Sequence, residues 1–415
     1  MGKSNQLLRL TRKIKIFGIR FRLIKKVYSN NRVLAGLFFI ILTAYNSCKI
    51  DKHPFEDTSN GKIRIVFLES TLKSKIPSLK LSSFAKSINY IKLETNDQCL
   101  LSHPSIEDVD EGAIYINDNH LYLYKFNGNG KYIWKIKKVG KGPGEYLHIT
   151  DVIIQPENDL LYILDNTQRK IIQYNLNGEF QKEIHLSVST GSFSQIDDCF
   201  VLWNPPWGFV DQNNCYFLTF LTLNGVKIKT INREGNNNSF RGGLLTSADF
   251  YMLNKILYIK DTYHDTVFRI SKNYTLEPHF IISQGKYKMT REMSENIWLR
   301  EKYMNEYISQ LVFWETDNLI IFSFFMEKYY LVIYDKQLSS FIHKSEGSLN
   351  KYAEIQNDLD NGTAFIPWFY KQTKLYGFFT PEEFKQNSSE NPAISRMFSA
   401  LNENSNPVVM IIELK

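Results

Sequence analysis

The chain has 415 residues and a formal net charge of +7, and 43% of its residues are hydrophobic and 14% aromatic. This apolar content is enough for a sizeable core and excludes an intrinsically disordered chain. Residues 1–48 hold ten Lys and Arg and no Asp or Glu, so the rest of the chain holds 40 basic and 43 acidic side chains. Because the remainder is slightly acidic, it offers no basic footprint, which argues against nucleic acid as a partner.

Residues 33–44 form an uncharged apolar run of twelve residues between the basic segment and Cys48. A transmembrane helix needs about 20 apolar residues, whereas about twelve suit the core of a secretory signal. A Cys after such a core, preceded by the small Ser47, resembles the lipobox of bacterial lipoproteins, although Tyr45 and Asn46 depart from its usual occupants. The resemblance implies an export segment over residues 1–48, a lipid on Cys48 and a membrane partner. A cleaved signal without lipid and a short uncleaved anchor are the alternatives.

The segment after the Cys is polar, and the first strand-like runs follow it. Residues 49–62 contain Pro54 and are expected to form a tether. Residues 63–68 (IRIVFL) and 89–94 (NYIKLE) alternate like strands. We therefore expect the folded domain to begin at residue 63.

Residues 139–184 contain four strand-like runs separated by turns, which is the pattern of one propeller blade of about 45 residues. Asn-Gly turns recur at Gly130, Gly178 and Gly225, which are 48 and 47 residues apart. Asn-Gly between alternating runs predicts a type I′ hairpin, in which both central residues have positive φ. Two further copies place Asn273 and Gln337 at this turn, with a helical insertion predicted near residues 286–307.

The C-terminal part is less regular. Residues 374–379 are strand-like, residues 381–401 are predicted to be rich in helix with Thr380 as an N-cap, and residues 408–414 (VVMIIEL) form a final apolar strand. A ring of blades must close, and we predict that residues 408–414 share a blade with a strand from residues 63–94. The expected fold is an all-β six-bladed β-propeller over residues 63–415, with four-stranded antiparallel blades and short helical insertions.

Several motifs of this region resemble the six-bladed β-propeller lipoprotein family of Gram-negative cell envelopes, a relative of NHL-repeat proteins. The matching segments are YIKLET from Tyr90, GKGPGEY from Gly140, LYILDNTQRKIIQYNLNGEF from Leu161, DTVFRISKNYTLEPHFIISQGKY from Asp265, and NPVVMIIELK at the C-terminus. The resemblance implies a propeller fold and an envelope address. It brings no general catalytic motif with it.

The glycine-rich GKGPGEY segment has two interpretations. It lacks the spacing and the following Ser or Thr of a phosphate-binding loop, so its glycines are more consistent with a tight turn between blades. Glu145, Tyr146 and Asp151 follow this turn and are predicted to face a ligand near the mouth of the ring. The alternative for Glu145 is a structural role, in which its carboxylate accepts backbone hydrogen bonds within the turn.

Asp165 and Asp261 recur at the same blade position after an LYI run. Such carboxylates could hold a divalent cation such as calcium in the central channel, with Asp151 and Asp165 as candidate ligands. The alternative is an Asx-type hydrogen bond that caps the following turn, and repetition favours it. The eight His residues show no HxxxH or HExxH spacing, and no GxSxG motif occurs.

Trp203 and Trp207 flank a Pro pair in WNPPWGF, and they could stack on a sugar or a peptide. Alternatively, this loop packs its own aromatic side chains over the sheet. Cys199 and Cys215 could form a disulfide in an oxidising envelope, which would leave Cys99 free.

These features together predict an exported lipoprotein of the bacterial cell envelope, in the outer membrane and facing the periplasm or the cell surface. Its propeller is expected to act as a non-catalytic binding or scaffold module for a protein, peptide or glycan. The alternative is an enzyme of the lactonase or lyase kind with a divalent metal in the channel, which rests on analogy of fold alone.

Overall fold

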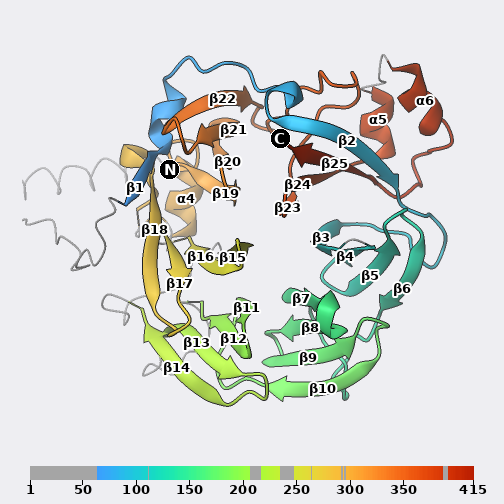
Figure 1. The fold of residues 1–415 in the computed structure, drawn as a ribbon, viewed down its shortest axis with the longest axis vertical. Helices are drawn as coiled ribbons and strands as arrows, with labels where there is room; N and C mark the ends of the chain where they lie inside the picture. Colours follow the sequence, from blue (N-terminus) through green and yellow to red (C-terminus); the bar gives the residue numbers. More distant parts are fainter. Residues whose placement is uncertain are drawn as a thin grey trace, which may run out of the picture. The chain divides into compact units, whose positions relative to one another are not determined.

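Six sheets surround a common axis in the computed structural model (Figure 1). The structure describes residues 63–110, 112–205, 216–233, 247–262, 264–290, 293, 296–386 and 391–415. These residues belong to one structural unit, Ile63–Lys415. The predicted six-bladed β-propeller is confirmed, and the export segment and tether lie outside the described residues.

The first three blades each contain four antiparallel strands in chain order. Blade 1 consists of β3 (Pro104–Val109), β4 (Ala113–Asp118), β5 (Tyr122–Asn127) and β6 (Tyr132–Ile136). Blade 2 consists of β7 (Asp151–Gln155), β8 (Leu160–Asp165), β9 (Lys170–Asn175) and β10 (Phe180–His185). Blade 3 consists of β11 (Ser192–Ile196), β12 (Cys199–Trp203), β13 (Tyr216–Thr222) and β14 (Lys227–Asn232).

The other three blades include both ends of the described chain. Blade 4 consists of β15 (Ala248–Leu253), β16 (Ile256–Asp261), β17 (Thr266–Ile270), β18 (Leu276–Ser283) and β1 (Arg64–Phe67). Blade 5 consists of β19 (Ser309–Glu315), β20 (Leu319–Met326), β21 (Lys328–Asp335) and β22 (Ser340–Glu346). Blade 6 consists of β23 (Phe369–Lys371), β24 (Lys374–Phe379), β25 (Val408–Leu414) and β2 (Ala85–Lys92).

The apolar runs in the sequence correspond to the second and third strands of each blade. A blade packs between two neighbours, so its central strands need apolar side chains on both faces. In β8, every residue from Leu161 to Asp165 is buried. Six apolar clusters form the core, one at each interface between neighbouring blades.

The ring closes where the first and last parts of the folded chain meet. β25 pairs antiparallel with β2 over the register Ala85↔Leu414 to Lys92↔Val408. The prediction that residues 408–414 share a blade with a strand from residues 63–94 is thus confirmed. The earlier strand of that range, β1, instead pairs parallel with β18 as a fifth strand of blade 4.

The Asn-Gly hairpins differ from the predicted type I′ turn. Gly178 has φ +80°, whereas Asn177 does not have a positive φ, and the N–H of Gly178 donates to the carbonyl oxygen of Asn175 at 3.0 Å. This is a type I turn followed by a left-handed residue, which lets the hairpin twist with its strands. Gly130 and Gly225 repeat the geometry.

In the fourth and fifth copies Asn273 and Gln337 lie in the hairpin turns, as predicted, but neither is the left-handed residue. Tyr274, and not Asn273, has the left-handed φ of +58° and donates its N–H to Ser271 at 2.9 Å. In blade 5 the left-handed residue is Ser339 and not Gln337. The left-handed position is one or two residues beyond the aligned residue, because only glycine identifies a left-handed position in the sequence.

Short helices occupy the predicted insertions. α4 (Ile297–Tyr303) lies between blades 4 and 5, while α5 (Pro381–Gln386) and α6 (Pro392–Met397) lie between β24 and β25. Thr380 and Glu383 cap α5 reciprocally, because each backbone N–H donates to the other's side chain. The 3-10 helices are η1 (Leu68–Leu72), η2 (Leu81–Ser83), η3 (Pro156–Asn158) and η5 (Gly285–Tyr287). Across the described ranges, no helix combines the length and the apolarity needed to cross a bilayer.

Candidate functional site at the long-loop face

The antiparallel strands send their connections alternately to two ends of the ring. One end receives the connections between blades and those between second and third strands, and we call it the long-loop face. It includes residues 93–103, 137–150, 284–308, 347–368 and 380–407. The opposite end carries hairpin connections of about two to four residues in the described chain, such as residues 128–131 and 372–373. Loops that carry function are typically concentrated on one face of a rigid scaffold, so the long-loop face is where a site is expected.

The GKGPGEY segment forms a self-contained turn on this face. Its ends are held by the N–H of Gly140, which donates to Tyr146 at 2.9 Å, and by the N–H of Tyr146, which donates to Lys138 at 2.9 Å. The carboxylate of Glu145 accepts a hydrogen bond from the N–H of Gly142 at 2.7 Å. Glu145 therefore lies where the structural alternative places it, with an oxygen engaged inside the turn.

Gly144 explains why this turn needs glycine. Its φ is +70°, and a Cβ at this position would lie 2.7 Å from the ring of Phe180. Its N–H donates to the carboxylate of Glu183 at 2.7 Å, and the same oxygen accepts from the buried Lys170 at 2.9 Å. The turn is thus fastened to blade 2.

Tyr146 does not face a ligand, which corrects the prediction for this residue. Its side chain is fully buried, and its hydroxyl donates to the carbonyl oxygens of Leu121 at 2.9 Å and Ile136 at 3.0 Å. Burial also raises the pKa of its phenol well above the ordinary range. The aromatic ring belongs to the core between blades 1 and 2.

Asp165 ends the second strand of its blade and is fully buried. Its carboxylate accepts hydrogen bonds from the backbone N–H groups of Leu147 at 2.7 Å and Gln168 at 3.1 Å. Asp118 has the same place in blade 1 and accepts from the N–H of His103 at 2.6 Å. These carboxylates hold the inter-blade connections to the second strands. Asp118 was not predicted, although the IND sequence at the end of β4 resembles the ends of the strands that carry Asp165 and Asp261.

Asp261 is the corresponding residue of blade 4. It accepts hydrogen bonds from the N–H of His264 at 2.9 Å and from the imidazole of His264 at 2.7 Å, and it forms an ion pair with Arg233 at 3.2 Å. Burial by itself would raise the pKa of Asp261, but the His264 contacts and the charge of Lys260 outweigh it and lower that pKa to about 2. The carboxylate is therefore ionised and engaged by neighbouring side chains.

Asp151 begins β7, the innermost strand of blade 2. One carboxylate oxygen accepts from its own neighbour Val152 at 2.9 Å and the other from the N–H of Phe193 in blade 3 at 2.8 Å. Burial raises the pKa of Asp151 to about 7, and the carboxylate of Glu107 adds to the shift. Asp151 thus lies on the inner side of the ring, and its carboxylate joins the first strands of two blades.

Four further carboxylates that were not predicted from the sequence lie on innermost strands, namely Glu107, Asp108, Asp249 and Glu315. Glu107 belongs to β3 and Asp249 to β15, and burial raises the pKa of both. Asp249 is exposed to solvent, yet the protein around it disfavours the ionised carboxylate and so raises its pKa. No shared strand position marks these carboxylates in the sequence, because Glu107, Asp151 and Asp249 are the fourth, first and second residues of their strands.

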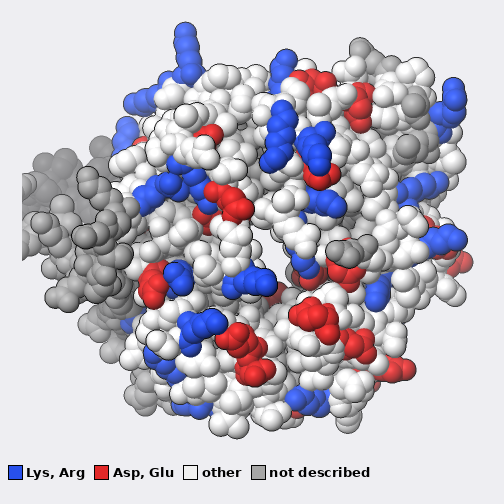
Figure 2. Space-filling view, in the orientation of Figure 1, with Lys and Arg blue, Asp and Glu red and all other residues white. Residues whose placement is uncertain are grey.

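These inner carboxylates do not converge. Within the residues that the structure describes, no three His, Cys, Asp or Glu side chains come together as metal ligands. Figure 2 shows basic and acidic side chains interspersed around the hollowed centre of the ring. The arrangement gives no support to the predicted calcium site at Asp151 or Asp165.

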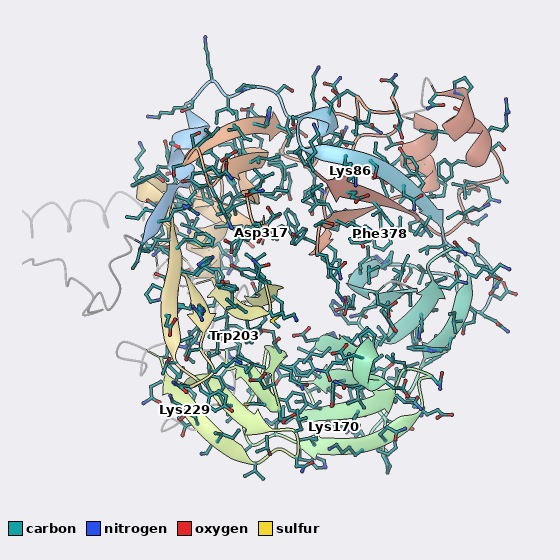
Figure 3. All side chains as sticks on the ribbon, in the orientation of Figure 1. Lys86, Lys170, Trp203, Lys229, Asp317 and Phe378 are labelled. Atoms are coloured by element: carbon teal, nitrogen blue, oxygen red, sulfur yellow. The ribbon has the colours of Figure 1, made fainter. Side chains whose placement is uncertain are left out.

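Trp203 is buried within blade 3, where it ends β12 (Figure 3). Its ring packs against Gly191, where an added Cβ would lie 2.4 Å from the indole. Trp203 is therefore a core residue and does not stack on a ligand, which corrects the prediction. Trp207 lies outside the described residues.

The predicted disulfide does not form at Cys199, which is a buried free thiol. Cys199 pairs with Thr222 at the far end of β13 from Tyr216, the neighbour of Cys215 in the chain. Cys215 itself lies outside the described residues.

One exposed aromatic group on the long-loop face was not predicted. Four rings follow one another between blades 5 and 6, and we call Phe325, Tyr329, Tyr352 and Trp368 the aromatic row. They come from β20, β21 and the connection over residues 347–368. No local sequence signal could have united them, because their neighbourhood depends on the packing of blade 5 against blade 6.

The fold and its geometry define a six-bladed β-propeller. The chain belongs to the family described as Domain of unknown function (DUF4934), whose model matches residues 63–413. Its fold is similar to that of a Bacteroides fragilis NCTC 9343 protein described as exported, with a TM-score of 0.66 and 17% identity, covering 85% of this chain and 99% of that one.

A member of the DUF4221 family from Bacteroides vulgatus ATCC 8482 is also similar, with a TM-score of 0.50 and 12% identity. That match covers 82% of this chain and 99% of the other. No curated protein matches the sequence significantly. At these identities the two structures support the fold alone.

Proposed function

We propose that the protein is an exported lipoprotein of the bacterial cell envelope, anchored through Cys48, whose propeller binds a ligand or partner on the long-loop face without converting it. Support for the address comes from the basic segment, the short apolar run and Cys48, which lie outside the described residues. The similar B. fragilis protein described as exported is consistent with it.

The observation that carries the binding role is that the long loops and the buried carboxylates have different roles in the ring. The long connections gather on one face, while carboxylates with catalytic potential hold backbone N–H groups, as Asp151 and Asp165 do. An enzyme needs a nucleophile, an acid-base pair or an open metal position aimed at a common point. The exposed long connections support a binding surface on this face.

Fractionation of cells tests the anchor. We expect the wild type in the membrane fraction and Cys48→Ser in the soluble envelope fraction, because the variant cannot form the thioether to lipid. Ser47→Ala is the matched control, since it keeps a small residue before the Cys and should remain anchored. Retention of Cys48→Ser in the membrane would contradict the proposal.

Metal analysis tests the non-catalytic role. We expect the purified protein to contain no stoichiometric divalent metal and its melting temperature to be equal in calcium and in EDTA. A melting temperature that rises with calcium and loses this response in Asp151→Asn would establish a channel metal site and favour the enzyme alternative.

A further inference from the structure

We propose that the aromatic row between blades 5 and 6 binds an uncharged carbohydrate chain. This inference rests on the proposed binding function and gives it a ligand class. The row is distinct from the GKGPGEY turn and from the inner carboxylates, and it is built from two strands of blade 5 and from the connection that leads to blade 6.

The rings form a continuous series. The ring centroids of Phe325 and Tyr329 are 5.0 Å apart, those of Tyr329 and Tyr352 are 4.4 Å apart, and those of Tyr352 and Trp368 are 5.2 Å apart. Tyr352 meets Trp368 at 78°, so the contact is edge to face. An edge-to-face contact leaves flat ring surface uncovered.

Exposure increases along the row. Phe325 is 2% exposed and Tyr329 is intermediate, whereas Tyr352 is 40% exposed and Trp368 is 49% exposed. The buried end anchors the series in the core, and the other end presents aromatic surface to solvent. An anchored core residue with an exposed, rigid aromatic neighbour is the arrangement that a binding surface requires.

Hydrogen bonds hold one ring and the backbone of the row in place. The hydroxyl of Tyr329 donates to the amide oxygen of Gln310 at 3.1 Å. The backbone N–H of Trp368 donates to Tyr376 of β24 at 2.9 Å, and Gly347 donates to the carbonyl oxygen of Tyr329 at 2.8 Å. The backbone that carries the exposed rings is thus anchored to β21 and β24, which lowers the ordering cost of binding.

Neighbouring charges compensate one another. Lys351 pairs with Glu354 at 2.9 Å in the connection that carries Tyr352. Lys344 pairs with Glu346 at 2.9 Å, and Lys328 pairs with the same carboxylate. These cations are compensated, which disfavours an anionic polymer. Exposed Glu327 in the turn between β20 and β21 leaves one carboxylate beside the row, where it can accept hydrogen bonds from hydroxyl groups.

A neutral sugar complements a surface of exposed aromatic rings and polar groups. Its C–H faces are apolar and match exposed ring surface, while its hydroxyls need donors and acceptors beside the rings. Exposed Gln310 keeps its amide group at the edge of the row, and the turn at residues 348–351 adds backbone groups. Successive exposed rings match the repeat of a chain better than a single monosaccharide.

Isothermal titration calorimetry on the mature full-length protein tests this assignment. The probes are maltohexaose, cellohexaose, xylohexaose and mannohexaose, with hexaproline and a polygalacturonate oligomer as the peptide and anionic alternatives. We expect saturable binding of at least one neutral hexasaccharide. Trp368→Ala and Tyr352→Ala should each weaken it by about tenfold or more, as expected when one stacked ring is lost.

Two variants control for folding and for aromatic content. Trp298→Ala removes an indole that is 77% exposed on α4 and outside the row, so binding should be unchanged. Trp368→Phe keeps a ring and should bind better than Trp368→Ala. Equal melting temperatures of the variants would show that lost binding does not reflect lost folding.

Each other outcome overturns the assignment. Failure of all four hexasaccharides to bind, binding that survives in both Trp368→Ala and Tyr352→Ala, or preference for hexaproline or polygalacturonate would each refute it. Chromatography of the sugar after incubation separates the two proposals. If the sugar is cleaved, the non-catalytic function is wrong but the ligand class stands. If the protein is anchored in the membrane but binds none of the sugars, only the ligand class is wrong.

Discussion

Removal of residues 406–415 should unfold the whole ring and not merely fray its end. β25 lies between β24 and β2, and it supplies Val408, Val409, Met410, Ile412 and Leu414 to the core. Val409 packs between blades 6 and 1, whereas Val408, Met410 and Ile412 pack between blades 5 and 6. The deletion therefore opens two interfaces and exposes two strand edges.

The magnitude follows from burial. Five buried apolar side chains contribute about 1.5–3 kcal/mol each, or roughly 7–15 kcal/mol together. The free energy of unfolding of a typical protein is about 5–15 kcal/mol, so the loss is comparable with the total. We expect no cooperative thermal transition for the truncated chain when near-UV and far-UV circular dichroism are recorded together.

Point variants give a graded version of the same test. Ile412→Ala should lower the free energy of unfolding by about 2–5 kcal/mol, because Ile412 is fully buried. Leu338→Ala is the matched control, since Leu338 is 68% exposed and its loss should cost less than about 0.5 kcal/mol. A truncated protein that melts cooperatively within a few degrees of the full chain would refute the closure mechanism.

Three further variants test the site geometry. Gly144→Ala should destabilise the protein by about 1–3 kcal/mol because of its positive φ and the contact with Phe180, whereas Gly112→Ala, whose Cβ would meet its nearest atom at 3.8 Å, should be close to neutral in urea unfolding. Equal effects would disprove the steric account. Asp165→Ala should cost at least about 1–3 kcal/mol, since it leaves two backbone N–H groups without their acceptor, and an unchanged urea midpoint would count against the capping role. The pKa of Asp151 is raised from 3.8 to about 7 on folding, so its contribution to stability is complete below about pH 4 and is lost as pH rises through about 7. Asp151→Asn removes this pH dependence. The free energy of unfolding of the variant relative to wild type should therefore be higher at pH 8 than at pH 5. An equal difference between variant and wild type at both pH values would contradict the assignment.

The fold could be predicted because its signals are local. Turn glycines such as Gly178 mark hairpins, and the apolar run of β25 requires burial on both faces. The repeat of about 48 residues then leaves few architectures other than a propeller. The pairing of the first and last strands of the ring could also be predicted, since a ring of blades cannot end with an open edge.

The side-chain roles were less predictable because they depend on packing direction. Tyr146 follows a glycine-rich turn, yet its ring points into the core between blades 1 and 2. Trp203 reads as a loop aromatic, but it is the last residue of a buried strand. Trp368 has no distinctive motif around it in the sequence, and only its contact with Tyr352, sixteen residues earlier in the same connection, makes it part of a surface.

The proposed function depends on the lipid at Cys48, and mass spectrometry of the protein isolated from the envelope tests it most directly. We predict an N-terminal peptide that begins at Cys48 and carries the mass of a diacylglycerol, with no residue upstream. An unmodified Cys48, or a mature chain that begins at another residue, would contradict the account.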